Sequence, residues 1–281
     1  MSSFIYKHYD QVALNHQYNN RELVPHYQQY FDLWPVLNRE VLDQFTFLRD
    51  IPYGDGLNEK LDIYPAQRKG GPTMIFIHGG YWQMMDRADF RFIAKAFVPH
   101  DIHTVIIGYP LAPAVTISRI IQSVRKALTW IHHQINAYGG DPDHLYLSGH
   151  SAGGHLASLM ITREYAPDDI KLRGVTALSG LYDLVPIQLS HVNIPIGMSK
   201  QEAIDCSPLH YTPNSTPLTL AVGADESDEY HAQLHSLVDV WSTSNDAIQS
   251  VILPGVNHFS ILSELLDSQS TLYSLLFNRS R

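Results

Sequence analysis

From about residue 45 onward, short β-branched or aromatic runs alternate with longer segments of helical periodicity, and this alternation limits the possible folds. A repeated β-then-α order is typical of a mostly parallel sheet covered by helices on both faces. Runs such as MIFI and TLAV are apolar throughout, as a sheet buried on both sides requires. We therefore expect an α/β fold with eight strands, at 45–50, 60–64, 73–78, 104–107, 145–148, 174–178, 218–222 and 249–253.

Four segments between these strands, 88–98, 117–136, 152–163 and 230–242, have the spacing of amphipathic helices. Residues 1–42 differ, because they are rich in aromatic side chains and show no strand pattern. We expect them to be helical and to cap a pocket of the main domain. The alternative, that these aromatic side chains only pack a helix against the body, stays open. The prediction is a single domain over 1–281, with a cap-like segment 1–42 and a core 43–281.

Composition excludes several classes of partner. A chain of 281 residues with 44% apolar residues can bury a large core, and its formal charge of -9 repels nucleic acids and anionic membranes. Cys206 is the only cysteine, so an intrachain disulfide is impossible, which suits a reducing compartment. The chain shows no signal peptide and no run of about 18 apolar residues. We expect a cytoplasmic protein that binds neither nucleic acid nor membrane, and the sequence leaves homodimer formation open.

The segment LYLSGHSAGGHLA places a G-x-S-x-G motif, Gly149 to Gly153, between an apolar strand and a helical run. A strand that turns so sharply into a helix needs small residues two positions either side of the serine, because larger side chains would collide with the adjacent backbone. Ser151 would then stand exposed at a helix N-terminus, where backbone N–H groups favour a developing negative charge. The sequence therefore predicts that Ser151 is a nucleophile.

A glycine pair follows the strand predicted at 73–78, in the segment HGGYW. Without Cβ atoms, Gly79 and Gly80 can turn their backbone N–H groups inward. Together with the N–H of Ala152, the residue after the nucleophile, these amides would form an oxyanion hole. His78 is expected to orient this loop through hydrogen bonds.

The base and the acid are expected after the last two strands. His258 follows the final strand and a Pro-Gly turn, and it must be neutral to accept the serine proton. Four carboxylates follow the strand predicted at 218–222, and only one can orient His258. Their distance from the strand end favours Asp225 or Glu226, while Asp228 and Glu229 suit the first turn of a helix. We find no spacing of metal ligands and expect neither metal nor cofactor.

These motifs resemble the kynurenine formamidase (arylformamidase) branch of the α/β-hydrolases, near the hormone-sensitive lipases and carboxylesterases. The likeness covers most of the chain. HGGYW is its most telling part, since broader lipases usually have a third glycine where Tyr81 stands. Its other segments are YNNR at 18–21, KLDIYP at 60–65, YGGDPDHLYLSGHSAGGHLA at 138–157, SGLYDL at 179–184, SPL at 207–209, ESDEYHAQ at 226–233 and NHF at 257–259.

The resemblance implies the α/β-hydrolase fold and hydrolysis of an aryl formamide such as N-formylkynurenine through an acyl-enzyme, without cofactor. It implies Ser151 as nucleophile and His258 as base. The catalytic aspartate of the family aligns with Glu226, so this chain has a glutamate where the family usually has an aspartate. On this alignment we prefer Glu226 to Asp225 as the acid.

The side chains expected to contact the substrate are Tyr81, Trp82 and His150. Two other functions remain open. A general carboxylesterase would use the same groups, whereas a non-catalytic ligand-binding protein would need none of them.

Overall fold

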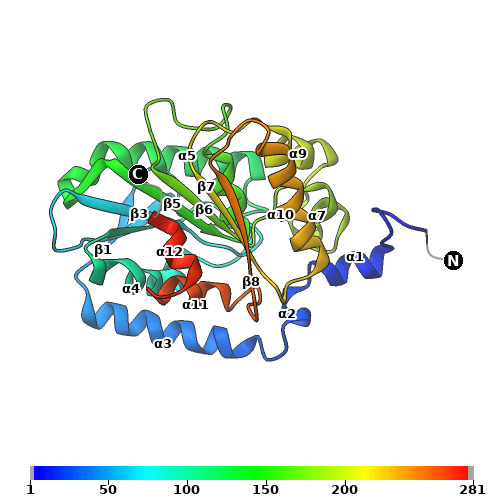
Figure 1. Cartoon of the computed structure of the whole chain (residues 1–281), viewed down its shortest axis with the longest axis horizontal. Coiled ribbons are helices and arrows are strands. Elements are labelled where there is room, and N and C mark those ends of the chain that lie inside the picture. The colour runs from blue at the N-terminus through cyan, green and yellow to red at the C-terminus, as the bar shows by residue number, and fades with distance from the viewer. Residues whose placement is uncertain (1–2, 278–281) are drawn as a thin grey trace.

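The computed structural model describes residues 3–277 and has an eight-stranded sheet at its centre (Figure 1). The strands lie in the order β1-β2-β4-β3-β5-β6-β7-β8. Neighbours from β4 to β8 are parallel, while β1 and β2 run antiparallel to their neighbours. The strand bounds are β1 Leu48–Pro52, β2 Lys60–Tyr64, β3 Gly71–Ile77, β4 His103–Ile107, β5 Gly140–His150, β6 Gly174–Leu178, β7 Leu218–Gly223 and β8 Ile248–Leu253. The predicted sheet is thus confirmed.

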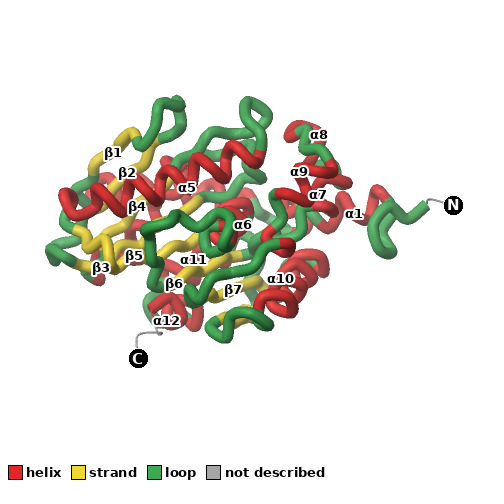
Figure 2. Tube along the Cα trace, turned by 90° about the horizontal axis from the view of Figure 1, so that it is seen from above, coloured by secondary structure: helices red, strands yellow, loops and turns green. Residues whose placement is uncertain are grey.

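Helices cover both faces of the sheet, and each face has its own apolar core (Figures 1 and 2). Helices α5 (Ile117–Gln134), α6 (Ala152–Leu159) and α10 (Asp228–Trp241) pack on one face. Helices α3 (Gln28–Gln44), α4 (Ala94–Phe97), α11 (Ile261–Leu266) and α12 (Thr271–Phe277) pack on the other. The interior strands β4 and β7 are buried at every position, which explains why most of their residues are apolar.

The helices and short 3-10 turns have the following bounds: α1 Gln11–Gln17, α2 Asn20–Leu23, α3 Gln28–Gln44, η1 Arg87–Ile93, α4 Ala94–Phe97, η2 Val98–His100, α5 Ile117–Gln134, η3 Ile135–Tyr138, α6 Ala152–Leu159, α7 Val185–Leu189, α8 Asn193–Ile196, α9 Lys200–Asp205, η4 Pro208–His210, α10 Asp228–Trp241, α11 Ile261–Leu266 and α12 Thr271–Phe277.

Two helices differ from their sequence predictions. The segment predicted as one helix at 88–98 is instead η1, α4 and η2 in succession, with a kink at Phe90. The helix predicted at 152–163 ends at Leu159, because the chain then turns and the Thr162 hydroxyl donates to the Leu159 carbonyl. Both errors arise because the spacing of apolar residues shows only which side chains are buried. A buried turn or 3-10 segment can have the same spacing as an α-helix.

The N-terminal segment is helical, as expected, and is wrapped along the outside of the sheet layers (Figure 1). α1 lies near α10, and α3 packs against η1 on the opposite side of the sheet from α5. Trp34 and Val41 are the buried residues of α3. No helix within residues 3–277 combines the length and apolarity needed to cross a bilayer.

Candidate active site

Ser151 occupies a sharp turn between β5 and α6, with φ of 58° and ψ of −119°. Its backbone N–H donates to the Leu178 carbonyl at 2.8 Å, which ties the turn to β6. A Cβ on Gly149 would lie 2.1 Å from the Gly153 carbonyl oxygen, and a Cβ on Gly153 would lie 2.0 Å from that of Ile77. Both distances are far below van der Waals contact, so glycine is needed at each position for the serine to take this backbone conformation.

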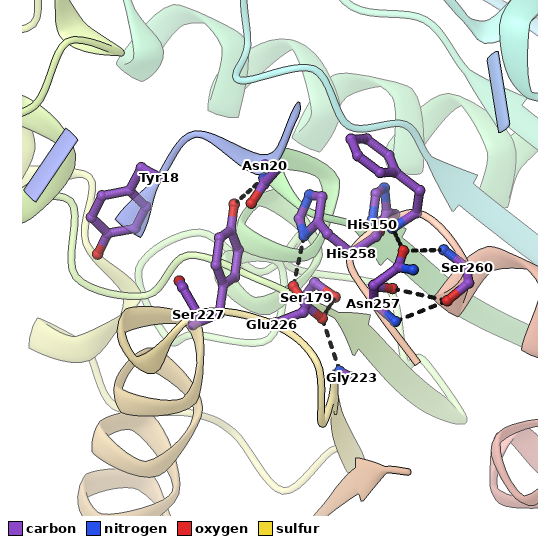
Figure 3. A network of polar contacts seen from close by, with 12 residues as sticks. Tyr18, Asn20, His150, Ser179, Gly223, Glu226, Ser227, Asn257, His258 and Ser260 are labelled. Atoms are coloured by element: carbon purple, nitrogen blue, oxygen red, sulfur yellow. Dashed lines mark hydrogen bonds and ion pairs between the residues drawn. The ribbon is translucent and has the colours of Figure 1, made fainter. Parts of the chain in front are cut away.

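The loops after β7 and β8 bring Glu226 and His258 together (Figure 3). His258 Nδ1 lies 2.7 Å from Glu226 Oε2, and the two side chains are 5% and 1% exposed. Glu226 Oε1 accepts hydrogen bonds from the Ser179 hydroxyl at 2.6 Å and from the Gly223 N–H at 2.8 Å. A carboxylate in this position therefore holds Nδ1 as the protonated nitrogen, which leaves Nε2 free to accept a proton.

The second candidate acid, Asp225, lies elsewhere. It is exposed, and its backbone N–H donates to the Val256 carbonyl at 3.0 Å. Among the contacts of residues 3–277, His258 Nδ1 is paired with Glu226 and not with Asp225. The two carboxylates are adjacent in sequence, but only Glu226 turns its side chain back beneath the end of β7.

The loop after β3 carries the predicted glycine pair beside the serine. A Cβ on Gly79 would lie 3.1 Å from Ser151 Cβ, so the Gly79 backbone runs directly past the serine. Gly80 has φ of 110°, a conformation that glycine adopts without steric cost. Ala152 is the first residue of α6, where a helix leaves its backbone N–H without an intrahelical acceptor. Gly79 and Ala152, two of the three residues expected to form the oxyanion hole, therefore lie beside Ser151, and Gly80 lines the same cavity as the serine.

His78 stabilises this loop through a hydrogen bond and a ring contact. Its Nδ1 donates to the Gly79 carbonyl at 2.8 Å, and its ring stacks on Tyr109 with centroids 4.2 Å apart. Burial lowers the pKa of His78 to about 4, so the imidazole is neutral at neutral pH. The Tyr109 hydroxyl donates to the His78 carbonyl at 2.9 Å. These contacts agree with an orienting role rather than proton transfer.

Ser151 and His258 line the same cavity of about 490 Å³. Most of its wall is aromatic or apolar, and the predicted residues Gly80, Tyr81 and His150 belong to it. A separate surface hollow of about 530 Å³ along α5 contains none of the predicted site residues. The other residues of the cavity wall are Tyr18, Asn19, Asn20, Arg21, Phe31, Trp34, Gln83, Met84, Met85, Phe90, His191, Val192, Ile194, Pro195 and Phe259.

The prediction that Trp82 contacts the substrate is wrong in this structure. Trp82 is fully buried, it does not line the cavity, and its indole N–H donates to His155 Nδ1 at 3.1 Å. At φ of 58°, Trp82 is turned into the core, whereas its neighbour Tyr81 faces the cavity. Alternation along an irregular loop is not visible in sequence, so the two aromatic residues could not be told apart.

Sequence reasoning missed Tyr230, which joins the site to the N-terminal segment. Its hydroxyl lies 2.9 Å from the Tyr81 hydroxyl and accepts from Asn20 Nδ2 at 2.9 Å. Its ring centroid is 4.8 Å from that of His258. Burial raises the pKa of Tyr230, and hydrogen bonding, in part with Ser151, opposes the rise. Asn20 and Tyr230 belong to the YNNR and ESDEYHAQ segments, which the sequence singled out only because they match the family, and nothing else in the sequence indicated this contact.

Several aromatic side chains from distant segments meet on one side of the cavity. Phe259 follows His258, with ring centroids 5.6 Å apart, and its ring contacts Phe31 of α3 at 5.5 Å. Phe31 in turn contacts Trp34 at 5.0 Å. This aromatic shelf, defined as Phe31, Trp34 and Phe259, offers an apolar surface next to the imidazole, with ring planes inclined to one another by 40 to 70°. The predicted N-terminal segment thus supplies part of the cavity wall.

Within residues 3–277, no three His, Cys, Asp or Glu side chains gather in a way that could hold a metal ion. The site chemistry available from the chain itself is a hydroxyl, an imidazole paired with a carboxylate, and backbone N–H donors. This set can carry out nucleophilic acyl transfer.

The chain matches the BD-FAE family over residues 61–226, which is more than half of its length. Kynurenine formamidase from Danio rerio is 31% identical over 239 residues, covering 82% of this chain and 80% of that protein. A putative thioesterase structure from Silicibacter sp. has a TM-score of 0.85 at 26% identity, covering 94% and 98% of the two chains. Esterase B from Lactobacillus rhamnosis has a TM-score of 0.69 at 18% identity, covering 92% and 93%. These likenesses confirm the predicted α/β-hydrolase fold.

Proposed function

We propose that this chain, a hydrolase that belongs to the BD-FAE family and groups with the kynurenine formamidases, cleaves aryl formamides such as N-formylkynurenine through a formyl-enzyme on Ser151. Glu226 and His258 would be the other two members of a catalytic triad. The backbone N–H groups of Gly79, Gly80 and Ala152 would form the oxyanion hole.

In the first half of the proposed reaction, Ser151 Oγ attacks the formyl carbon while His258 Nε2 takes the hydroxyl proton. Glu226 accepts the hydrogen bond from Nδ1 and stabilises the imidazolium. The carbonyl oxygen becomes an oxyanion, which the backbone donors stabilise by about 3 to 4 kcal/mol each. The C–N bond then breaks, and the imidazolium gives its proton to the departing aryl amine.

In the second half, water attacks the formyl carbon of the ester on Ser151, with His258 again as base. Breakage of the ester bond releases formate and returns the proton to Ser151. Apart from the substrate and water, every group named in the two halves belongs to the chain. The aromatic shelf beside His258 would hold the aryl ring, since offset or edge contacts between aromatic rings are favourable.

The strongest support for this proposal is the contact between His258 and Glu226. A 2.7 Å contact between two nearly fully buried side chains, His258 and Glu226, orients an imidazole in the cavity that also contains Ser151. A protein that only bound a ligand would not need a buried imidazole–carboxylate hydrogen bond there, and it would not need a serine in a strained backbone conformation. The ligand-binding alternative is therefore disfavoured.

A general carboxylesterase is the second candidate, and the cavity favours it specifically. At about 490 Å³ the cavity is much larger than a formyl group, and its wall is mainly apolar. Such a wall would also accept the acyl chains and alcohols of small esters. The chemistry on Ser151 would be the same, and only the leaving group would differ.

Two measurements test the proposal. Ser151→Ala removes one hydroxyl at the base of the cavity, so we expect turnover of aryl esters and formamides to disappear while thermal unfolding is unchanged. Unaltered rates with the purified variant would rule out the mechanism. Catalytic efficiency with N-formylkynurenine should exceed that with p-nitrophenyl acetate, and the opposite order would favour the carboxylesterase.

We also propose a cytoplasmic location. The single cysteine, Cys206, is buried, and burial raises the pKa of its thiol to about 11. The chain therefore forms no internal disulfide that would need an oxidising compartment. A fluorescent fusion that appeared in a secreted fraction would contradict this location.

A further inference from the structure

The charge of the cavity wall is unlike that of the protein as a whole. The chain has a formal charge of -9, yet no aspartate or glutamate belongs to the described cavity wall, and Arg21 contributes its one permanent charge. Arg21 is itself exposed to solvent where it borders this mainly apolar cavity, and with no carboxylate in the wall its charge favours anions among the molecules that enter. The cavity is therefore electrostatically suited to a negatively charged small molecule.

Arg21 lies over the same aromatic surface that leads to His258. Its guanidinium carbon is 5.5 Å from the ring centroid of Phe31 and 5.8 Å from that of Tyr27. Phe31 contacts Phe259, and Phe259 contacts His258, at centroid separations of 5.5 and 5.6 Å. A planar group bound on the shelf would thus have the imidazole at one end and the guanidinium at the other.

The guanidinium is not used by another acidic side chain. Within residues 3–277, Arg21 takes part in no ion pair, and its guanidinium donates a weak hydrogen bond to Met84 Sδ at 3.9 Å. Asp89 shares an adjoining hollow with Arg21, but its carboxylate accepts from the Asp86 backbone N–H. The planar donors of Arg21 therefore remain available to a ligand.

We propose that Arg21 is a specificity-determining residue that binds a carboxylate on the leaving-group side of the substrate, so that the enzyme selects aryl acyl compounds bearing an anionic side chain. This inference deepens the proposed function and rests on it for the position of the scissile bond. The Arg21 guanidinium lies over the rings of Phe31 and Tyr27, beside the shelf, where a carboxylate can accept two parallel hydrogen bonds from it. The selectivity would lie in substrate binding, because Arg21 does not touch the scissile carbonyl.

The test uses matched substrates that differ only in charge. One pair is N-formylkynurenine and its analogue with a primary amide in place of the carboxylate. The second pair is an acetoxyphenyl propanoate and the corresponding primary amide, which any aryl esterase can cleave. The variants are Arg21→Gln and Arg21→Lys, with Arg39→Gln on the exposed surface of α3 as a control for the loss of one positive charge.

We expect Arg21→Gln to raise KM for the carboxylates about tenfold, with little change in kcat and little change for the amides, as the loss of a charge-assisted hydrogen bond predicts. Arg21→Lys should keep part of the preference, and Arg39→Gln should keep all of it. High salt should reduce the preference of the unaltered enzyme.

Two outcomes would overturn the inference: unchanged kinetics of Arg21→Gln, or an equal loss for the charged and neutral members of each pair. If the enzyme does not cleave N-formylkynurenine at all, the proposed function fails. The ester pair then still reports on Arg21 independently.

Discussion

Replacing Glu226 by glutamine should reduce kcat by about four orders of magnitude, or about 5.5 kcal/mol of activation free energy. The substitution keeps the shape of the side chain but makes one of its two ends a donor. The Oε1 position faces two donors, the Ser179 hydroxyl and the Gly223 N–H, at 2.6 and 2.8 Å. The amide carbonyl must therefore take that position, because in the opposite orientation the amide NH₂ would face the Gly223 N–H, a donor that cannot become an acceptor.

The amide NH₂ group then faces His258 Nδ1, which lies 2.7 Å from Oε2 in the unaltered protein. Two donors cannot face each other, so the imidazole moves its proton from Nδ1 to Nε2. Nε2 is the atom that must accept the proton of Ser151, and in this tautomer it cannot do so. KM should change little, since Glu226 does not line the cavity.

The assay is the steady-state hydrolysis of an aryl ester, with Asp225→Asn as the matched control for an exposed neighbouring carboxylate. The control should retain full activity. The reasoning is refuted if Glu226→Gln keeps more than a tenth of the original kcat while remaining folded.

Three further predictions concern stability and reactivity. Gly153→Ala should lower the free energy of unfolding by more than about 3 kcal/mol, because its Cβ would lie 2.0 Å from a backbone carbonyl oxygen. Gly174→Ala, whose Cβ would meet only ordinary contacts at 3.5 Å, should lower it far less, and urea titration measures both. Burial lowers the pKa of His78 and His155 from 6.5 to about 4, so as the pH falls these histidines are protonated in the unfolded chain before they are protonated in the folded protein. Their contribution to the free energy of unfolding is complete above pH 6.5 and should fall by about 1.4 kcal/mol per pH unit per histidine between pH 6.5 and 4. Denaturant titrations at several pH values measure this slope, which His155→Gln should reduce. Iodoacetamide at pH 8 should modify Cys206 slowly in the native protein and rapidly in urea, and rapid native labelling would contradict its burial and its raised pKa of about 11.

The strands and the residues next to them could be predicted from sequence because their signals are local. The run before Gly149 is apolar on both faces, and the motif around Ser151 combines a strand, a tight turn and a helix within a few residues. His258 could be placed because the end of a parallel strand points to one edge of the sheet. Choosing Glu226 over Asp225 needed the family alignment, since residue type and spacing left both open.

The walls of the cavity could not be predicted, because they depend on contacts between distant segments. Nothing in the local sequence indicates that Phe31 meets Phe259, or that Tyr230 accepts a hydrogen bond from Asn20. The error at Trp82 has the same origin. A loop with successive positive φ values has no fixed alternation, so side-chain direction there depends on the tertiary packing.

The contact between α3 and the loop after β8 has a consequence for synthesis on the ribosome. Asn257 Nδ2 donates to the Tyr30 hydroxyl at 3.0 Å across a separation of 227 residues, beside the packing of Phe259 on Phe31. The aromatic face of α3 emerges from the ribosome well before its partner in the loop after β8. Until that loop emerges, a nascent chain has neither the His258 imidazole nor the finished aromatic wall, and the apolar face of α3 is exposed to aggregation.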